Sequence, residues 1–240
     1  MNRPYIVCHM VTSIDGKVTG DFLGLPACED ATEVYYEINR EYKSRGSGGF
    51  ICGRITMEGS FTGGAYPDLS EYEPPKKENG RYSDFWSDVQ NDYYAIAFDP
   101  RGKLGWKSAF IEDFDPGYDK AQIIEVLTEQ VDGRYLSYLR DRGISYFFAG
   151  DVEIDVEYAL NVISNKLRPK FYLLEGGSII NGHFLRAGCI DELSLVQAPV
   201  TADKDSKPLF ADGVPLDFEL TRAVCKKGAT VLNYKAKKQI

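Results

Sequence analysis

The sequence predicts an α/β protein with a mostly parallel central sheet that ends in an antiparallel hairpin. Short apolar runs alternate with amphipathic stretches along most of the chain, which is the pattern of strands and covering helices. Several of these runs end at glycines, where a strand turns into a helix. Two final β-rich runs, 218–224 and 230–236, are joined through Lys226-Lys227-Gly228 and read as the hairpin. We expect residues 1–240 to form one domain.

The expected strands and helices follow from the spacing of apolar residues. Tyr5–Thr12 is almost continuously apolar or β-branched, which is typical of a strand covered on both faces. Residues 30–43 place their apolar side chains on one helical face. Residues 155–167 form a helix whose acidic first turn suits the helix dipole. Further strands are expected at 49–53, 93–98, 123–127, 144–149, 170–174 and 192–198, and further helices at 133–142 and 179–187.

The region 61–92 does not follow this pattern. It contains Gly63-Gly64 and Pro74-Pro75 among mixed charges, so it is expected to be a long loop: a lid, a binding loop or an insertion. Its tyrosines either stack on a planar substrate or pack within the protein. The tyrosines concerned are Tyr66, Tyr72 and Tyr82.

Composition narrows the functional classes. With 28 basic and 36 acidic residues the net charge is −8, which disfavours nucleic acid and anionic membranes as partners. No apolar run approaches the roughly 20 residues of a membrane helix, and no export signal is evident. Five cysteines without a C-x-x-C pair indicate free, mostly buried thiols in a reducing compartment, so we expect a cytoplasmic protein. The chain has only two histidines, which are few candidates for a zinc site or a Ser-His-Asp triad, and no metal is expected.

The strongest local motif is the stretch 171–179. A buried strand runs into Glu175, two glycines and Ser178 follow, and a helix begins at Ile179. Glycines allow close approach of a ligand, and a helix N-terminus offers N–H groups to an anion such as a pyrophosphate. An ordinary tight strand–helix turn is the alternative interpretation, since the motif is not G-x-G-x-x-G.

Two further turns follow buried strands. At Gly53-Arg54-Ile55-Thr56, Arg54 can reach a phosphate and Thr56 can cap the next helix. At Thr12-Ser13-Ile14-Asp15-Gly16-Lys17, a carboxylate and an ammonium group can meet the polar edge of a heterocycle, unless Asp15-Gly16 is only a turn. Two glycine turns together suit a long anionic ligand such as a dinucleotide.

These three segments, in this order, resemble the reductase domain of bacterial bifunctional riboflavin-biosynthesis deaminase-reductases, a relative of dihydrofolate reductase. Gly182–Leu185, Asp191-Glu192-Leu193 and Ala198-Pro199 extend the match, which covers most of the chain outside 61–92. The resemblance implies a dihydrofolate-reductase-like three-layer fold, NADPH as cofactor, a small heterocyclic substrate and a homodimer. No deaminase signature is present, so only the reductase chemistry is expected.

The resemblance also implies roles for individual residues. Lys17 and Glu175 match positions that face the substrate, and we expect them to be catalytic: Glu175 accepts hydrogen bonds from a pyrimidine or pterin, and Lys17 donates one. Asp15, Ser60 and Arg45 are expected on the substrate side. The positions expected to contact the nucleotide are Thr12, Gly53, Arg54, Thr56, Gly150, Gly176, Gly177, Ser178 and Ile179.

Some positions depart from the family pattern, and they keep alternatives open. Ser60 stands where the riboflavin enzymes have an aspartate, and Arg40 competes with Arg45 as the substrate-side arginine. The first hypothesis is a 5-amino-6-(5-phosphoribosylamino)uracil reductase-like enzyme that works by hydride transfer. A reductase of a dihydrofolate, dihydropterin or other heterocycle is the alternative, and a catalytically silent NADPH-binding module is another. A structural domain without nucleotide would require both glycine turns to be accidental.

Overall fold

The computed structural model describes residues 3–88 and 91–237. The chain forms two compact units. Unit 1 contains Gly48–Arg168 together with Met1–Arg3, and unit 2 contains Pro4–Ser47 and Pro169–Ile240. The expectation of one domain stays a prediction.

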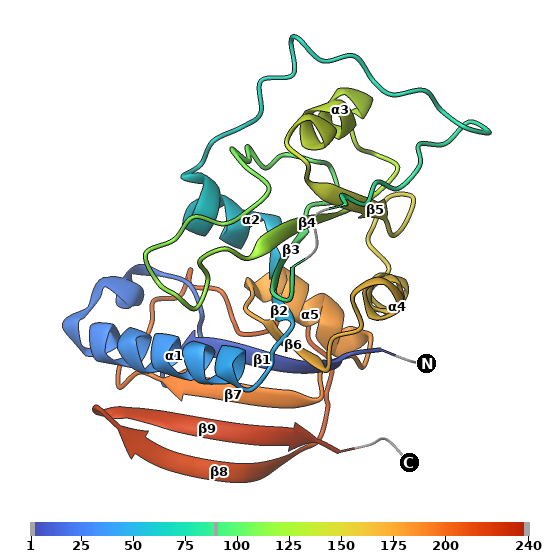
Figure 1. Ribbon diagram of the computed structural model, residues 1–240. Helices are drawn as coiled ribbons and strands as arrows, with labels where there is room; N and C mark the ends of the chain where they lie inside the picture. Colours follow the sequence, from blue (N-terminus) through green and yellow to red (C-terminus); the bar gives the residue numbers. More distant parts are fainter. Residues whose placement is uncertain (1–2, 89–90, 238–240) are drawn as a thin grey trace. The chain divides into compact units, whose positions relative to one another are not determined.

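Unit 1 is built on four parallel strands in the order β5-β4-β3-β2 (Figure 1). Their side chains are almost all buried, as expected for strands covered on both faces. The strands are β2 (Gly49–Gly53), β3 (Tyr94–Phe98), β4 (Gln122–Leu127) and β5 (Ser145–Phe148). The helices are α2 (Arg54–Met57), the π-helical turn η2 (Glu58–Thr62), α3 (Gly133–Asp141) and α4 (Val156–Leu167).

Unit 2 has parallel strands β6, β1 and β7, followed by the antiparallel pair β9 and β8 (Figure 1). The long helix α1 packs against this sheet through aromatic contacts: Tyr35 stacks on His9 of β1 with ring centroids 4.3 Å apart. The strands are β1 (Tyr5–Thr12), β6 (Phe171–Leu174), β7 (Glu192–Gln197), β8 (Phe218–Lys226) and β9 (Ala229–Ala236). The helices are the 3-10 turn η1 (Asp21–Gly24), α1 (Pro26–Ser44) and α5 (Ser178–Arg186).

The strand and hairpin predictions are confirmed to within about two residues. The first helix is longer than expected: it begins at Pro26, because proline without its N–H is well suited to the first helical turn. The turn after β2 also differs from expectation. Thr56 lies inside α2 and caps nothing, while Gly53 is the N-cap residue.

The loop region packs on unit 1. Phe85 forms an antiparallel bridge with Tyr146 of β5, and Trp86 stacks on Phe147. Tyr72 packs edge-on against Tyr138 of α3 and hydrogen-bonds Asp141. The bridge to β5 occupies hydrogen-bonding groups of an edge strand that would otherwise be open to another chain.

Two surface lysines have partners that the sequence did not suggest. In unit 2, Lys226 and Lys227 both form ion pairs with α1. The Lys226 and Lys227 ammonium nitrogens lie 2.7 and 2.6 Å from the Glu37 carboxylate, and Lys227 also pairs with Glu33. The β8–β9 hairpin is therefore tied to the helix by charge as well as by packing.

The five cysteines are free, and four of them are buried as expected; Cys225 is exposed. No group of three His, Cys, Asp or Glu side chains in the described ranges could hold a metal ion.

Candidate functional site

Glu175 follows the last residue of β6 and is buried, with 6% of its surface exposed. The amide of Asn39, a fully buried residue of α1, donates a hydrogen bond of 2.7 Å to its Oε1. A carboxylate buried in this way needs hydrogen bonds to offset its lost hydration. Asn39 supplies one such bond and orients the group.

The glycine turn begins directly after Glu175. Gly176 has φ 87°, in the left-handed region that favours glycine, and the bond between Gly176 and Gly177 is cis. A Cβ on Gly176 would lie 2.9 Å from the methyl carbon of Met10, so the turn fits tightly against β1. Gly177 is the N-cap of α5 and has no side chain to cap the helix. The turn therefore leaves the N–H groups of the first turn of α5 without a side-chain partner at Gly177.

A short segment around Pro208 joins this turn to the Lys17 loop. The Ser178 hydroxyl donates to the Pro208 carbonyl, and Lys17 pairs with Pro208 through the backbone. Leu209 N–H also donates to the carbonyl of Gly16 at 3.0 Å. Lys17 and Ser178 therefore contact the same residue of unit 2, although 161 positions separate them in the chain. Within the described residues, the Lys17 ammonium forms neither an ion pair nor a hydrogen bond.

Asp15 has a clear local role in the same loop. Its Oδ1 accepts hydrogen bonds from the Ser13 hydroxyl at 2.8 Å and from Ala202 N–H at 3.0 Å. These bonds lower the pKa of Asp15, with the Ser13 hydroxyl as the largest cause. Asp15 thus acts as an anchor of the loop. Thr12 is buried at the end of β1, where it pairs with Gln197 at the end of β7.

The remaining nucleotide candidates lie in unit 1. Arg54 forms an ion pair with Glu58 one turn later, and its charge also acts on the nearby buried Asp99. Thr56 is half-buried in α2, and Ser60 is exposed in η2.

Gly150 follows β5 in a tight turn. It has φ 146°, and a Cβ there would lie 2.0 Å from the Glu153 carbonyl oxygen, so only glycine fits. Its carbonyl accepts a hydrogen bond from Glu129 N–H at 3.1 Å. This backbone contact by itself explains the glycine.

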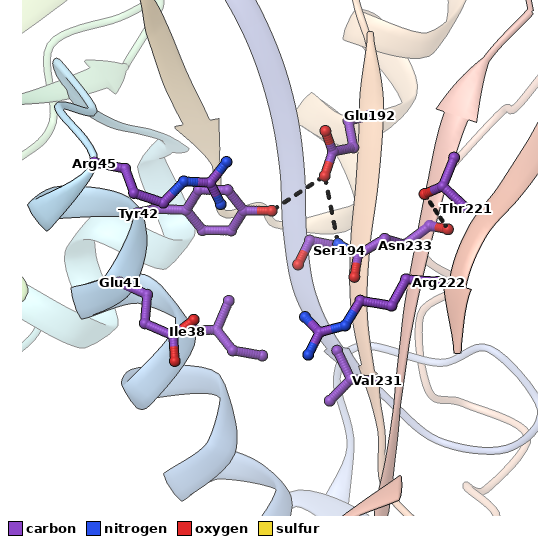
Figure 2. A pocket seen from close by; sticks show the side chains of 10 residues that line it. All are labelled: Ile38, Glu41, Tyr42, Arg45, Glu192, Ser194, Thr221, Arg222, Val231 and Asn233. Carbon is purple, nitrogen blue, oxygen red and sulfur yellow. Dashed lines mark hydrogen bonds between the residues drawn. The ribbon is translucent and has the colours of Figure 1, made fainter. Parts of the chain in front are cut away.

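Arg45 is the C-cap residue of α1. It follows α1 and lines a pocket of about 210 Å³ beside Glu192, the first residue of β7 (Figure 2). Thr12, by contrast, pairs with the last residue of β7. Because α1 runs back along the sheet, its C-terminal end is carried to the amino end of β7. The substrate role that the resemblance implies for Arg45 stays a prediction.

Asn39 is the residue that the sequence analysis missed. It falls on the inner face of α1 between Ile38 and Tyr42, and all three are buried. A polar side chain at a core position of an amphipathic helix was the available signal, since buried amides need partners. Its Oδ1 has no hydrogen-bond partner among the described residues.

In the described part of the chain, no helix is long and apolar enough to cross a membrane.

No protein-family model matches the sequence, and no curated protein matches it.

Solved structures, in contrast, match nearly the whole chain. A pyrimidine reductase-like protein from Corynebacterium diphtheriae superposes with a TM-score of 0.68 at 17% identity, covering 99% of this chain and 94% of that one. Acinetobacter baumannii RibD gives a TM-score of 0.62 at 18% identity, with 99% and 59% covered. The riboflavin biosynthesis reductase Rib7 of Saccharomyces cerevisiae gives 0.60 at 12% identity, with 99% and 91% covered. The chain thus spans a little over half the length of RibD.

These likenesses are strong in shape and weak in sequence, so they establish the fold. The chain has the fold of the pyrimidine reductases of riboflavin biosynthesis.

Proposed function

We propose that this protein is an NADPH-dependent reductase of a pyrimidine- or pteridine-type substrate, most similar in activity to 5-amino-6-(5-phosphoribosylamino)uracil reductase. The observation that carries the proposal is the buried Glu175 carboxylate, held by Asn39 and followed at once by the glycine turn and the N-terminus of α5. One short segment thus combines an acceptor for heterocycle N–H groups with donors for a phosphate.

The residues of unit 2 fit a phosphate-bearing nucleotide. Helix α5 has nine residues and begins with no side-chain cap, and Ile179 in its first turn is 60% exposed. Backbone N–H groups at such a helix start attract anions, and the helix dipole adds to the attraction. Gly176, Gly177, Ser178 and Ile179 would hold the pyrophosphate, with Thr12 nearby in the sheet. When bound, NADPH supplies the hydride.

Lys17 and Glu175 would act on the substrate. Glu175 accepts hydrogen bonds from ring N–H or amino groups and sets the orientation of the heterocycle. The Lys17 ammonium has no ion pair in the described residues, so it can donate to a carbonyl or to an oxygen that gains charge during reduction. Their joint role is to position the reacting atoms and stabilise charge.

In unit 1 we propose that Gly53, Arg54, Thr56 and Gly150 contact the nucleotide. Arg54 is the residue suited to the 2′-phosphate. Its ion pair with Glu58 must be exchanged for that contact, so the preference for NADPH over NADH tests its role directly. We also propose that the protein is a homodimer and acts in the cytoplasm. Sedimentation of the purified protein measures the oligomeric state.

The first test is a titration of the purified protein with NADPH and with NADH, followed by nicotinamide fluorescence. We expect micromolar binding of NADPH and weaker binding of NADH. Ile179→Glu would place a carboxylate at the start of α5 and lower the affinity at least about tenfold by charge repulsion. The matched control is Leu23→Glu, at a residue that is 42% exposed in η1, and it should bind as the wild type does. No binding of either nucleotide would refute the proposal.

The second test is NADPH oxidation with the aminouracil ribosylamine phosphate and with dihydropterins. Turnover of the former supports the proposed substrate, whereas turnover of dihydropterins alone supports the alternative favoured by Ser60. Tight NADPH binding with no turnover of either class would indicate a silent nucleotide-binding module.

A further inference from the structure

We propose that unit 2 carries a second binding site, in the pocket lined by Tyr42, Arg45, Glu192, Arg222 and Asn233, for a small zwitterion of amino-acid size. The pocket has a volume of about 210 Å³ and lies between the end of α1 and strands β7, β8 and β9 (Figure 2). That volume is below the range of about 300–1,000 Å³ that is usual for drug-sized ligands, so a dinucleotide does not fit.

This pocket is distinct from the site proposed for the nucleotide. Glu192 and Ser194 stand in the first half of β7, whereas Thr12 pairs with Gln197 at its far end. The five steps from Glu192 to Gln197 correspond to about 16 Å along a strand. The residues that line the pocket include neither Glu175 nor Asn39 nor any residue of the glycine turn.

The inner wall of the pocket presents hydrogen-bond acceptors. The hydroxyls of Tyr42 and Tyr5 donate to the Glu192 carboxylate at 3.2 and 3.3 Å, and the Asn233 amide approaches it at 3.4 Å. Burial, followed by the charge of Glu192, raises the pKa of Tyr42 and of Tyr5 to about 12, so both hydroxyls stay protonated donors. Asn233 Oδ1 is buried and has no hydrogen-bond partner in residues 3–88 and 91–237. An ammonium or amine group would satisfy this oxygen and neutralise Glu192, which forms no ion pair in those ranges.

The outer wall presents two guanidinium groups. Arg45 lies over the Tyr42 ring, 5.2 Å from its centroid, and Figure 2 shows the Arg222 side chain reaching into the pocket from β8. Neither group forms an ion pair within the part of the chain that the structure describes. Two neighbouring arginines that form no ion pair with the described residues are suited to a carboxylate. Glu41 also lines the pocket, and its carboxylate limits the net positive charge there.

An irregularity in the sheet aims Arg222 at the pocket. The register of β8 against β9 shifts between Leu220 and Arg222, and the Thr221 hydroxyl donates to the Asn233 carbonyl at 3.0 Å. An extra residue in one strand turns the following side chains, and such bulges are common beside functional sites. Without the shift, Arg222 would face the other side of the sheet.

The test uses the full-length protein without nucleotide and the twenty L-α-amino acids, each added alone, with thermal shift and calorimetry as readouts. We expect at least one amino acid to raise the melting temperature and bind with a dissociation constant below 1 mM. Its methyl ester and its N-acetyl derivative should each bind at least tenfold more weakly, since each lacks one charge. Arg222→Gln should weaken binding at least tenfold, whereas Lys204→Gln, on a loop away from the pocket, should leave it unchanged.

Three results would overturn this proposal: no binding by any of the twenty, equal binding to Arg222→Gln, or ester and acetyl derivatives that bind as well as the parent. Sedimentation of both variants covers a further outcome. If Arg222→Gln changes the oligomeric state and no amino acid binds, the pocket is part of an interface between copies of the chain.

Discussion

Asn39 Nδ2 and Glu175 Oε1 lie 2.7 Å apart, and both side chains are buried in unit 2. The helix that carries Asn39 ends before the segment Gly48–Arg168 of unit 1, and Glu175 follows strand β6, which comes after that segment. This contact links the inner face of α1 to the turn on which the proposed chemistry depends. The first two predictions test the roles of Glu175 and Asn39 separately.

Glu175→Gln should lower kcat/KM by about 100-fold, because the amide loses the charge that orients and polarises the substrate's N–H groups. The affinity for NADPH should stay within about twofold, since the phosphate donors are backbone groups of the following turn. Steady-state kinetics and nicotinamide fluorescence measure the two effects. Unchanged turnover would exclude Glu175 from the substrate site.

Asn39→Leu should leave Glu175 with one hydrogen bond fewer and lower the free energy of unfolding by about 1–3 kcal/mol. Asn39 is a positioning residue, so the informative readout is the pH profile of kcat/KM. Its acid limb should move to higher pH in Asn39→Leu, because the lost bond stabilised the charged carboxylate. Asn39→Ser, which keeps a donor, should restore part of the shift. A profile identical to that of the wild type would show a packing role only.

His9 should make the protein sensitive to acid. It is fully buried, and burial lowers its pKa from 6.5 to about 4. As the pH falls, His9 is therefore protonated in the unfolded chain before it is protonated in the folded protein. The stability due to neutral His9 is complete above pH 6.5 and is lost as the pH falls to about 4. The loss amounts to about 3 kcal/mol. His9→Phe should be less stable at pH 7 but should have a flatter denaturation profile from pH 6.5 to 4.

His183→Gln is the matched control, since it removes the other histidine of the chain. Urea denaturation at each pH gives the free energies. If His9→Phe keeps the wild-type slope, the acid sensitivity comes from other groups.

Glu125→Gln should stabilise the protein at alkaline pH. Burial and the charge of Asp99 raise the pKa of Glu125 well above its usual value. The folded state therefore favours protonated Glu125, and the protein loses stability as the pH rises and this carboxyl group must ionise. Glutamine keeps an oxygen that can accept from the Tyr135 hydroxyl and the Trp106 indole N–H. We expect a gain of at least about 1 kcal/mol at pH 9 that shrinks toward pH 5.

The control for this variant is Glu129→Gln, which removes the same charge just after β4. Chemical denaturation across the pH range compares the two. Parallel profiles for Glu125→Gln and the wild type would mean that Glu125 does not titrate in this range.

Gly182→Ala should destabilise unit 2 by about 1–3 kcal/mol and weaken NADPH binding. A Cβ at this position would lie 1.9 Å from the Ala211 carbonyl oxygen, which forces α5 and the segment around Ala211 apart. That segment is bonded to Ser178 at the start of α5. Gly24→Ala is the control, because a Cβ there meets nothing within 4 Å. Equal melting temperatures for the two variants would contradict the close packing.

Features that depend on residues close together in the chain were predictable from the sequence alone. Continuous apolar runs predict β1 and β2, because neither face of a strand that is buried on both sides is exposed to solvent. The turn at Gly176 was predictable because a positive φ at the end of a strand favours glycine. The terminal hairpin followed from two β-rich runs and the turn at Gly228 for the same local reason.

Tertiary structure decided which distant residues meet. Asn39 lies 136 residues from Glu175, and the ion pair between Lys227 and Glu37 spans 190 positions, so no local spacing could indicate either contact. The direction in which α1 runs along the sheet places Arg45 beside Glu192 at the amino end of β7, and no local spacing could indicate that neighbour either. Which side chains meet across a fold depends on the register of the strands and on the direction of the helices. Both are selected by the packing of the whole core. A single sequence records the composition of that core but not its pairings.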